Sequence, residues 1–369
     1  MDSKFSLCGT LCHLCGTLCY KKGYTELHRV RTENHRVKLI FTFVFLLALG
    51  TTAIAQQKIN WNGYLQYRFS DNYLNQTNFS VRRAKFWVDS LLPADEGNWS
   101  YKLQANFLQQ VKFQFLLQDV LVSYKINNFE VTAGQFVPDF SLQRKQPDYL
   151  IPLDERADVV NALVPGAETM ARDIGVELKL ADSKIGSFPK GFSISFGFFN
   201  GNGANTVSNK RNFLYVNRGN LFLFNNSESK LELGYNLSYR DAHDLQFSKI
   251  FGDNYSFTGN DFRFGFEEKF NLGDFELQSE YIEAHLGNQK AYGCYALADY
   301  LFASKNLITL SVEQLIDLNP TTVDNPWYVI GYSYLVKGND IKISLDNKFQ
   351  FASNRTNALT TLQIQYFFN

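Results

Sequence analysis

The chain has 369 residues, with 36 Lys or Arg against 36 Asp or Glu, so its formal charge at neutral pH is zero. Residues 1–55 hold seven of the bases and three of the acids, which leaves 29 bases, 33 acids and a net charge of −4 in residues 56–369. That composition lacks the basic excess that binds nucleic acid, so no nucleic-acid partner is expected.

The first feature along the chain is a tandem repeat, LCGTLCH followed by LCGTLCY. It holds four of the five cysteines, Cys8, Cys12, Cys15 and Cys19. One interpretation is a metal site made by these cysteines with His13. We favour another, in which residues 1–36 are a non-native upstream extension, because the secretory signal that follows belongs at an N-terminus. Cys294 has no partner, as in proteins that do not rely on disulfides.

Residues 36–55 read RVKLIFTFVFLLALGTTAIA, with the parts of a secretory signal peptide. Arg36 and Lys38 give the positive start, and Ala53-Ile54-Ala55 gives the small-residue cleavage site. The apolar run between them has 12 residues, whereas a membrane-spanning helix needs about 20. A buried core helix is the alternative. We predict a signal peptide over 37–55 and a barrel domain over 56–369.

Residues 56–369 alternate between apolar and polar side chains. In 340–351, one face carries Ile341, Ile343, Leu345, Phe349 and Phe351, and the other carries Lys342, Ser344, Asp346, Lys348 and Gln350. The segments 230–240 and 361–368 share this period of two, which indicates β-strands with one apolar and one polar face. A soluble sandwich alternates in the same way, so the period alone does not choose between the two classes.

Strand length, aromatic placement and turn length favour a membrane barrel. We count sixteen strands, which begin near residues 58, 77, 98, 113, 129, 170, 191, 211, 229, 258, 274, 289, 305, 325, 340 and 356. Most run 10–14 residues, longer than the usual 5–6 of globular sheets, and aromatic residues gather at their ends, as in interfacial girdles. A count of fourteen stays open, because strand boundaries read from sequence shift by about two to four residues.

The connections between these strands also alternate in length. Tight turns mostly follow even-numbered strands, whereas the long connections at 138–169, 201–210, 241–257 and 318–324 follow odd-numbered ones. A barrel whose N-terminus is periplasmic has this parity. We therefore predict an all-β fold, a transmembrane antiparallel barrel of about 16 strands.

Four blocks of the sequence resemble a known family, the phosphate-selective porin O/P family of outer-membrane channels. They are residues 79–86 (FSVRRAKF), 118–124 (QDVLVSY), 134–142 (GQFVPDFSL), and 161–163 with 172–176 (NAL and RDIGV). They look like the family's arginine-rich early strand, its D-x-x-V-x-Y strand, and the start and the end of its constriction loop.

The resemblance implies a 16-stranded channel, often a homotrimer, in the outer membrane of a Gram-negative bacterium, with an inward-folded constriction loop. Segment 138–169 follows the fifth strand, where that loop belongs. The implied partners are outer-membrane lipid and small anions or polar solutes, and no cofactor is expected.

Basic residues are the candidates for the pore lining, because a guanidinium fork matches an oxyanion with two parallel hydrogen bonds. The candidates are Arg68, Arg82, Arg83, Lys85 and Lys102 on the first three strands and Arg144, Lys145 and Arg156 on the inward loop. In the resembled family such bases line the central anion site. Arg82 and Arg83 match its motif directly, and the others are inferred from location. That these bases only solvate the lumen wall stays open.

Alternation within a strand limits which of these bases reach the lumen. We expect Arg83, Lys85 and Trp87 to face inward and Arg82 to lie near the outer rim. Acidic residues are expected to oppose the bases across the constriction and to weaken selectivity. They are Asp139, Asp148, Asp154, Glu155 and Asp158 on the loop, with Glu276, Glu280 and Glu283 facing partly inward.

Enzymatic function is disfavoured. His243 and His285 are isolated, the pair Ser238 and His243 has an unpersuasive spacing, and neither G-x-S-x-G nor H-E-x-x-H occurs. The predicted function is passive diffusion of small hydrophilic solutes or anions, phosphate among them, through a water-filled pore. The alternative, from a different class, is a closed structural or adhesive barrel plugged by loop 138–169.

Overall fold

The computed structural model describes residues 59–369, except 75, 95–96, 110–112, 183–190, 207–209, 227, 254 and 353–354. The cysteine repeat, the upstream extension and the signal peptide predicted for residues 1–55 lie outside the described residues.

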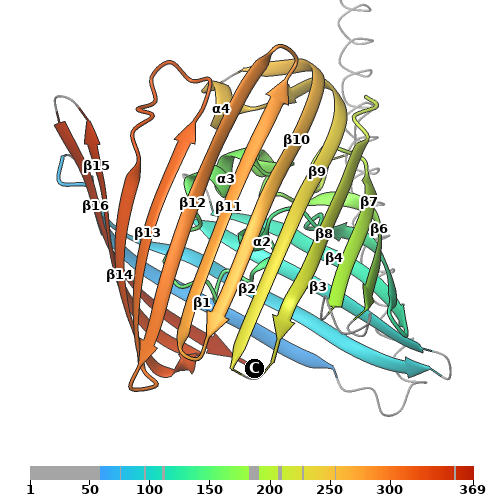
Figure 1. Cartoon of the computed structure of the whole chain (residues 1–369), viewed down its shortest axis with the longest axis horizontal. Coiled ribbons are helices and arrows are strands. Elements are labelled where there is room, and N and C mark those ends of the chain that lie inside the picture. The colour runs from blue at the N-terminus through green and yellow to red at the C-terminus, as the bar shows by residue number, and fades with distance from the viewer. Residues whose placement is uncertain are drawn as a thin grey trace, which may run out of the picture. The chain divides into compact units, whose positions relative to one another are not determined.

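Sixteen antiparallel strands form one closed barrel, in which each strand pairs with the next along the chain and β16 pairs with β1 (Figure 1). The strands are β1 (Asn60–Asp71), β2 (Thr77–Ala94), β3 (Gly97–Gln109), β4 (Phe113–Ile126), β5 (Phe129–Phe136), β6 (Asp173–Asp182), β7 (Gly191–Phe199), β8 (Leu214–Asn225), β9 (Ser229–Gln246), β10 (Ser256–Leu272), β11 (Phe275–Leu286), β12 (Gln289–Phe302), β13 (Asn306–Ile316), β14 (Trp327–Asn339), β15 (Ile341–Ala352) and β16 (Arg355–Phe368). Closure leaves no sheet edge unpaired, which a bilayer requires.

The barrel turns its apolar side chains outward. On β15, Ile343 and Leu345 are 40% and 41% exposed on the outer face, whereas Lys342, Ser344 and Asp346 are buried on the inner face. This confirms the predicted alternation, with the polarity that a lipid surround demands rather than that of a soluble sandwich. Among the described residues, no helix is long and apolar enough to cross a membrane.

The predicted count of sixteen strands is confirmed, and the alternative of fourteen is wrong. Every predicted start lies within three residues of the observed one. The predicted connection 241–257 is too long, because β9 continues to Gln246 and pairs there with the start of β10. The last part of β9 carries Asp241 and His243 on its outer face. Because these outer residues are polar, the apolar alternation that indicates a strand is absent from the sequence there.

The long segment 137–172 folds into the barrel and carries three short helices (Figure 1). They are α2 (Leu142–Lys145), α3 (Asp158–Leu163) and the 3-10 helix η2 (Ala167–Thr169). We call this segment the inward loop. A fourth helix, α4 (Ser248–Phe251), lies in the connection between β9 and β10 and also packs inward.

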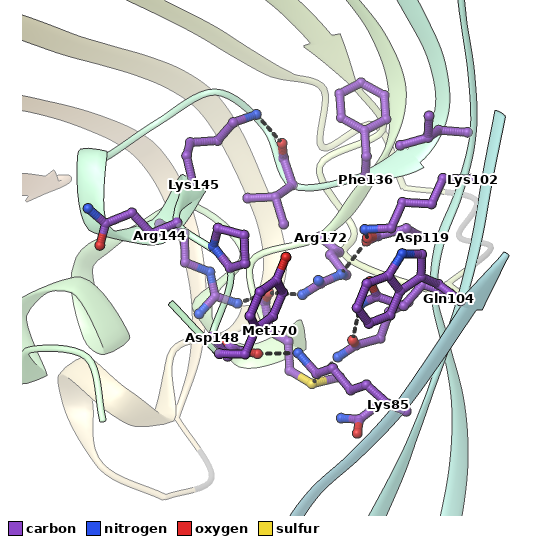
Figure 2. A pocket seen from close by; sticks show the side chains of 18 of the residues that line it. Lys85, Lys102, Gln104, Asp119, Phe136, Arg144, Lys145, Asp148, Met170 and Arg172 are labelled. Atoms are coloured by element: carbon purple, nitrogen blue, oxygen red, sulfur yellow. Dashed lines mark hydrogen bonds and ion pairs between the residues drawn. The ribbon is translucent and has the colours of Figure 1, made fainter. Parts of the chain in front are cut away.

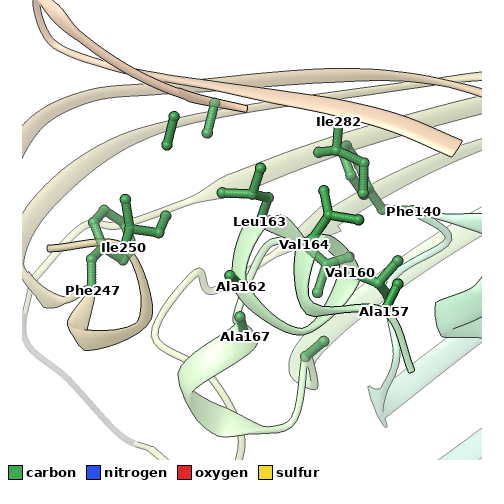
Figure 3. Packing of buried hydrophobic residues seen from close by; sticks show 14 of the residues in the cluster. Phe140, Ala157, Val160, Ala162, Leu163, Val164, Ala167, Phe247, Ile250 and Ile282 are labelled. Atoms are coloured by element: carbon green, nitrogen blue, oxygen red, sulfur yellow. The ribbon is translucent and has the colours of Figure 1, made fainter. Parts of the chain in front are cut away.

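A hydrophobic core inside the barrel fixes the inward loop to one wall. Val160 and Leu163 of α3 are fully buried, and they belong to the same apolar cluster as Ile282, Ala284 and Leu297 on the inner face of β11 and β12. Figure 3 shows α3 between Ile282 on one side and Phe247 and Ile250 of the α4 connection on the other. The loop therefore fills the β10–β13 side of the lumen.

Candidate pore-lining site

A cavity of about 1130 Å³ lies between the inward loop and the inner faces of β1–β6. Its lining includes eleven Lys or Arg residues against seven Asp or Glu residues. Figure 2 shows the part where Lys85, Arg144 and Arg172 point toward one another around Asp148 and Met170. The cavity lies on this side because the loop docks on the opposite wall, and its lining carries an excess of four positive groups.

Seven of the eight predicted bases line this cavity. Arg68 does not; it lies buried in the β1 wall directly behind the lining and donates to the loop. The sequence analysis missed four further bases of the lining, Arg172, Lys179, Lys249 and Lys348. Arg172 lies in the RDIGV block and Lys348 on a polar strand face, so a sequence pattern could have pointed to both. No such pattern points to Lys249.

A β-bulge brings Arg82 and Arg83 to the same side of β2. Gln66 pairs with Arg83 and Tyr67 pairs with Val81, so Arg82 is the extra residue of the bulge. Strict alternation predicted that Arg82 lies near the outer rim. That placement is wrong, because the bulge resets the alternation and both guanidinium groups reach the inward loop.

Glu155 of the inward loop is held by three arginines. Its Oε1 accepts from Arg68 Nη1 at 2.6 Å and Arg82 Nε at 2.5 Å, and its Oε2 accepts from Arg82 Nη2 at 3.0 Å and Arg83 Nη2 at 3.1 Å. Burial alone would raise the pKa of Glu155, but the three guanidinium groups outweigh it and hold that pKa well below its usual range.

Asp148 forms a second ion-pair centre on the loop. Its carboxylate binds Lys85 and Arg156 directly and lies 3.6 Å from Arg83 Nε. Burial opposes its ionisation, but the surrounding positive charges prevail and hold the pKa of Asp148 well below the usual value. Two loop carboxylates therefore contact the bases directly, where the sequence predicted a field of acids and bases opposed across an open lumen.

Arg144 and Arg172 add positive charge between these centres. Arg172 Nε donates to Asp119 Oδ1 at 2.7 Å, and Lys102 binds the other oxygen of Asp119 at 2.9 Å. Arg144 donates to the Met170 carbonyl, and no carboxylate within the described residues lies at ion-pair distance from it. Burial and the like charges of Arg156 and Arg172 lower the pKa of Arg144.

Acidic residues of the wall anchor the loop backbone instead of opposing the bases. Glu280 accepts the amides of Leu142 at 3.0 Å and Gln143 at 2.7 Å. Glu177, Asp346 and Glu313 accept the amides of Asp139, Asp154 and Asp158 at 2.9, 2.7 and 2.7 Å. These carboxylates are therefore engaged in positioning the loop.

Glu283, predicted to face partly inward, lies on the outer face. It alternates with Ile282 and Ala284, which are buried in the inner core. Its partners are Tyr281, His285 at 2.7 Å and Lys290 at 3.0 Å. The prediction assumed that the polar residues of a strand face the lumen. That rule fails here, because the inner face of β11 is apolar where α3 packs against it.

The block GQFVPDFSL turns the chain from β5 into the lumen. Gly134 has φ 127°, and a Cβ there would lie 2.1 Å from the Val120 carbonyl oxygen, so only glycine fits. Gln135 donates to the carbonyls of Leu117 and Gln118 at 2.9 and 2.8 Å, which ties the turn to β4. Ser141 then caps α2 by accepting the Arg144 amide at 3.2 Å.

The described residues give no sign of a metal centre, since no group of three His, Cys, Asp or Glu among them is placed to hold an ion. The cysteine repeat and His13, which offered a metal site only as the disfavoured interpretation of the sequence, lie outside the described residues.

Solved porins share this fold. A loop L8 deletion mutant of OmpT, an outer membrane protein of Vibrio cholerae, matches at a TM-score of 0.59 and 10% identity, over 85% of this chain and 99% of that one. OmpF of Salmonella typhi matches at 0.58 and 15%, over 85% and 98%. A triple mutant of the Rhodopseudomonas blastica porin matches at 0.54 and 12%, over 84% and 100%. No curated protein matches the chain.

The sequence itself gives the family. The model of the phosphate-selective porins O and P matches residues 55–308, more than half of the chain. The match spans β1–β12 and the inward loop, including all eight predicted bases. The chain therefore has the fold of an outer-membrane channel and belongs to the phosphate-selective porin O and P family.

Proposed function

We propose that this porin lets small anions and small hydrophilic solutes diffuse passively along the β1–β6 wall. The charge of the cavity lining carries this proposal. The lining has four more positive than negative groups, although residues 56–369 as a whole have a net charge of −4. A pore attracts counter-ions through the charge that lines it, not through the charge of the whole protein.

Phosphate is the anion that the lining suits best. Its oxygens match planar guanidinium forks, and Arg83, Arg144 and Arg172 present such forks within one cavity. Arg144 contributes a charge that no described carboxylate neutralises. Of the wall carboxylates, Glu177 and Glu280 accept loop amides, and Asp119 is paired with Lys102 and Arg172.

Export and assembly complete the proposal. We propose cleavage after Ala55, insertion of residues 56–369 into the outer membrane of a Gram-negative bacterium, and residues 1–36 as a non-native extension. One of the structural neighbours, OmpT of Vibrio cholerae, is described in a trimer form, and we propose a homotrimer for this chain too.

A closed barrel without conductance is the second candidate, and one observation favours it. The inward loop is fixed on two sides, by Glu155 and Asp148 on the β1–β2 wall and by α3 on the β11–β13 wall. A loop so held spans the lumen and could seal it. The cavity beside it is the argument for an open path.

Reconstitution in a planar bilayer distinguishes the two candidates. The refolded chain, residues 56–369, should give stable open steps in potassium chloride, and addition of inorganic phosphate should reduce the chloride current. A chain that inserts but gives no steps would support the closed barrel. Open steps without any effect of phosphate would leave a general porin and reject phosphate.

A further inference from the structure

Glu155 occupies a site already built for an oxyanion. Four guanidinium N–H groups surround its carboxylate, supplied by Arg68, Arg82 and Arg83, with N···O distances of 2.5–3.1 Å. Each of its two oxygens accepts two of these bonds, the arrangement that charge-assisted recognition of carboxylate or phosphate uses. Three positive groups face one negative group, so the site keeps an excess of two positive charges.

The site opens onto the proposed solute path. The side chains of Glu155 and Arg82 are 39% and 36% exposed, and both line the cavity together with Arg83. Arg68 and Arg83 are buried behind them, where their positions are fixed by Gln363 and Gln66. A solute in the cavity can therefore approach the forks, and those of Arg68 and Arg83 are held in place.

The residues on either side of Glu155 are held without its help. The Asp154 amide donates to Asp346 at 2.7 Å, and its side chain accepts from Gln363 at 3.0 Å. Arg156 Nε donates to the Gln143 carbonyl at 3.0 Å. The Glu155 side chain can therefore leave the arginines by rotating about its own bonds, while the loop backbone stays docked.

We propose that Glu155 is a tethered competitor for this site, and that an oxyanion of the phosphate class binds to Arg68, Arg82 and Arg83 by displacing it. This inference rests on the proposed function. Competition from a tethered carboxylate lowers the affinity of the arginines for a free anion, so an anion leaves soon after it binds. A conducting site needs such weak binding, since a site that holds its ion stops the flow.

The test is the phosphate concentration that halves the chloride current of single channels in a bilayer at pH 7. Glu155→Gln removes the competing charge and keeps the side-chain shape. It should lower the half-inhibiting concentration about tenfold, the effect of about 1.4 kcal/mol of lost competition. Asp158→Asn is the matched control. It removes one negative charge from the same loop, but Asp158 pairs with Lys348 on β15 instead, so it should leave the value within about twofold.

Each result of this test distinguishes failure of the proposed function from failure of the tethered competitor. A wild-type channel without anion current would contradict the proposed function. A wild-type channel that phosphate inhibits, with E155Q unchanged, would overturn the tethered competitor alone, as would an equal shift in D158N. If E155Q does not insert, Glu155→Asp replaces it. This variant keeps the charge but withdraws the carboxylate by one methylene, so it should shift the value in the same direction, and no shift would overturn the proposal.

Discussion

At the scale of single residues, the carboxylates of the lumen fall into two sets that bind different partners. Carboxylates of the inward loop bind the bases of β1 and β2, and carboxylates of the opposite wall bind loop amides. Two bases of the lining differ, because their side chains donate only to backbone carbonyls among the described residues: Arg144 to Met170, and Lys249 to Asn161 and Ala167. A passing ion therefore meets the charges of these two bases without a carboxylate at ion-pair distance among the described residues.

Arg144→Gln should reduce anion preference more than any loss of a paired base. A unit charge about 4 Å from an ion contributes roughly 1 kcal/mol in water, so the anion-to-cation permeability ratio should fall about two- to fivefold. The reversal potential in a salt gradient measures this ratio. Lys337→Gln is the control and should change nothing, because Lys337 lies at the exposed end of β14 and pairs with Asp340. Equal ratios in R144Q and wild type would remove Arg144 from the ion path.

The lowered pKa values of Asp148 and Glu155 predict a loop that resists acid. A carboxylate whose pKa falls on folding contributes its full stability above the unfolded value, 3.8 for Asp and 4.5 for Glu, and loses it only as pH drops toward the folded value. Protection of the loop against hydrogen exchange, compared across pH under matched conditions, should therefore be the same at pH 7 and pH 5. Its loss already at pH 5 would show that these ion pairs do not hold the loop.

At the scale of elements, a structural feature could be predicted from sequence when its cause lies within one strand or one turn. Alternation and tight turns are local, so the sixteen strand starts were accessible from sequence. The bulge at Arg82 depends on how β1 and β2 pair, which no single strand reveals. Glu283 was misplaced for a similar reason, because the inner face of β11 is apolar only where α3 docks on it.

Docking of α3 is itself open to test through Leu163. Leu163→Ala removes a fully buried side chain and should cost about 2–5 kcal/mol of docking free energy. The loop should then open more often, so trypsin should cut faster at Arg144, Lys145 or Arg156 while the barrel keeps its heat-dependent migration on a gel. Leu310→Ala, on the outer face of β13, is the control. Equal cleavage of both variants would mean that α3 does not fix the loop.

At the scale of the whole molecule, sequence predicted the barrel better than the site. The inward position of segment 138–169 came from a family resemblance. Seven of the eight basic residues predicted for the pore lining do line one cavity. The pairing of Glu155 with three arginines, and the anchoring of loop amides by Glu280, join residues far apart in the chain. Such contacts follow from closure of the barrel around the loop, so residue order alone could not supply them.

The central claim is that the solute path is a basic channel along β1–β6. The most direct test is the reversal potential of the reconstituted wild-type chain in a tenfold gradient of potassium chloride. We predict stable open channels whose reversal potential lies on the chloride side of zero. A potential on the potassium side, or an inserted protein without conductance, would contradict the account.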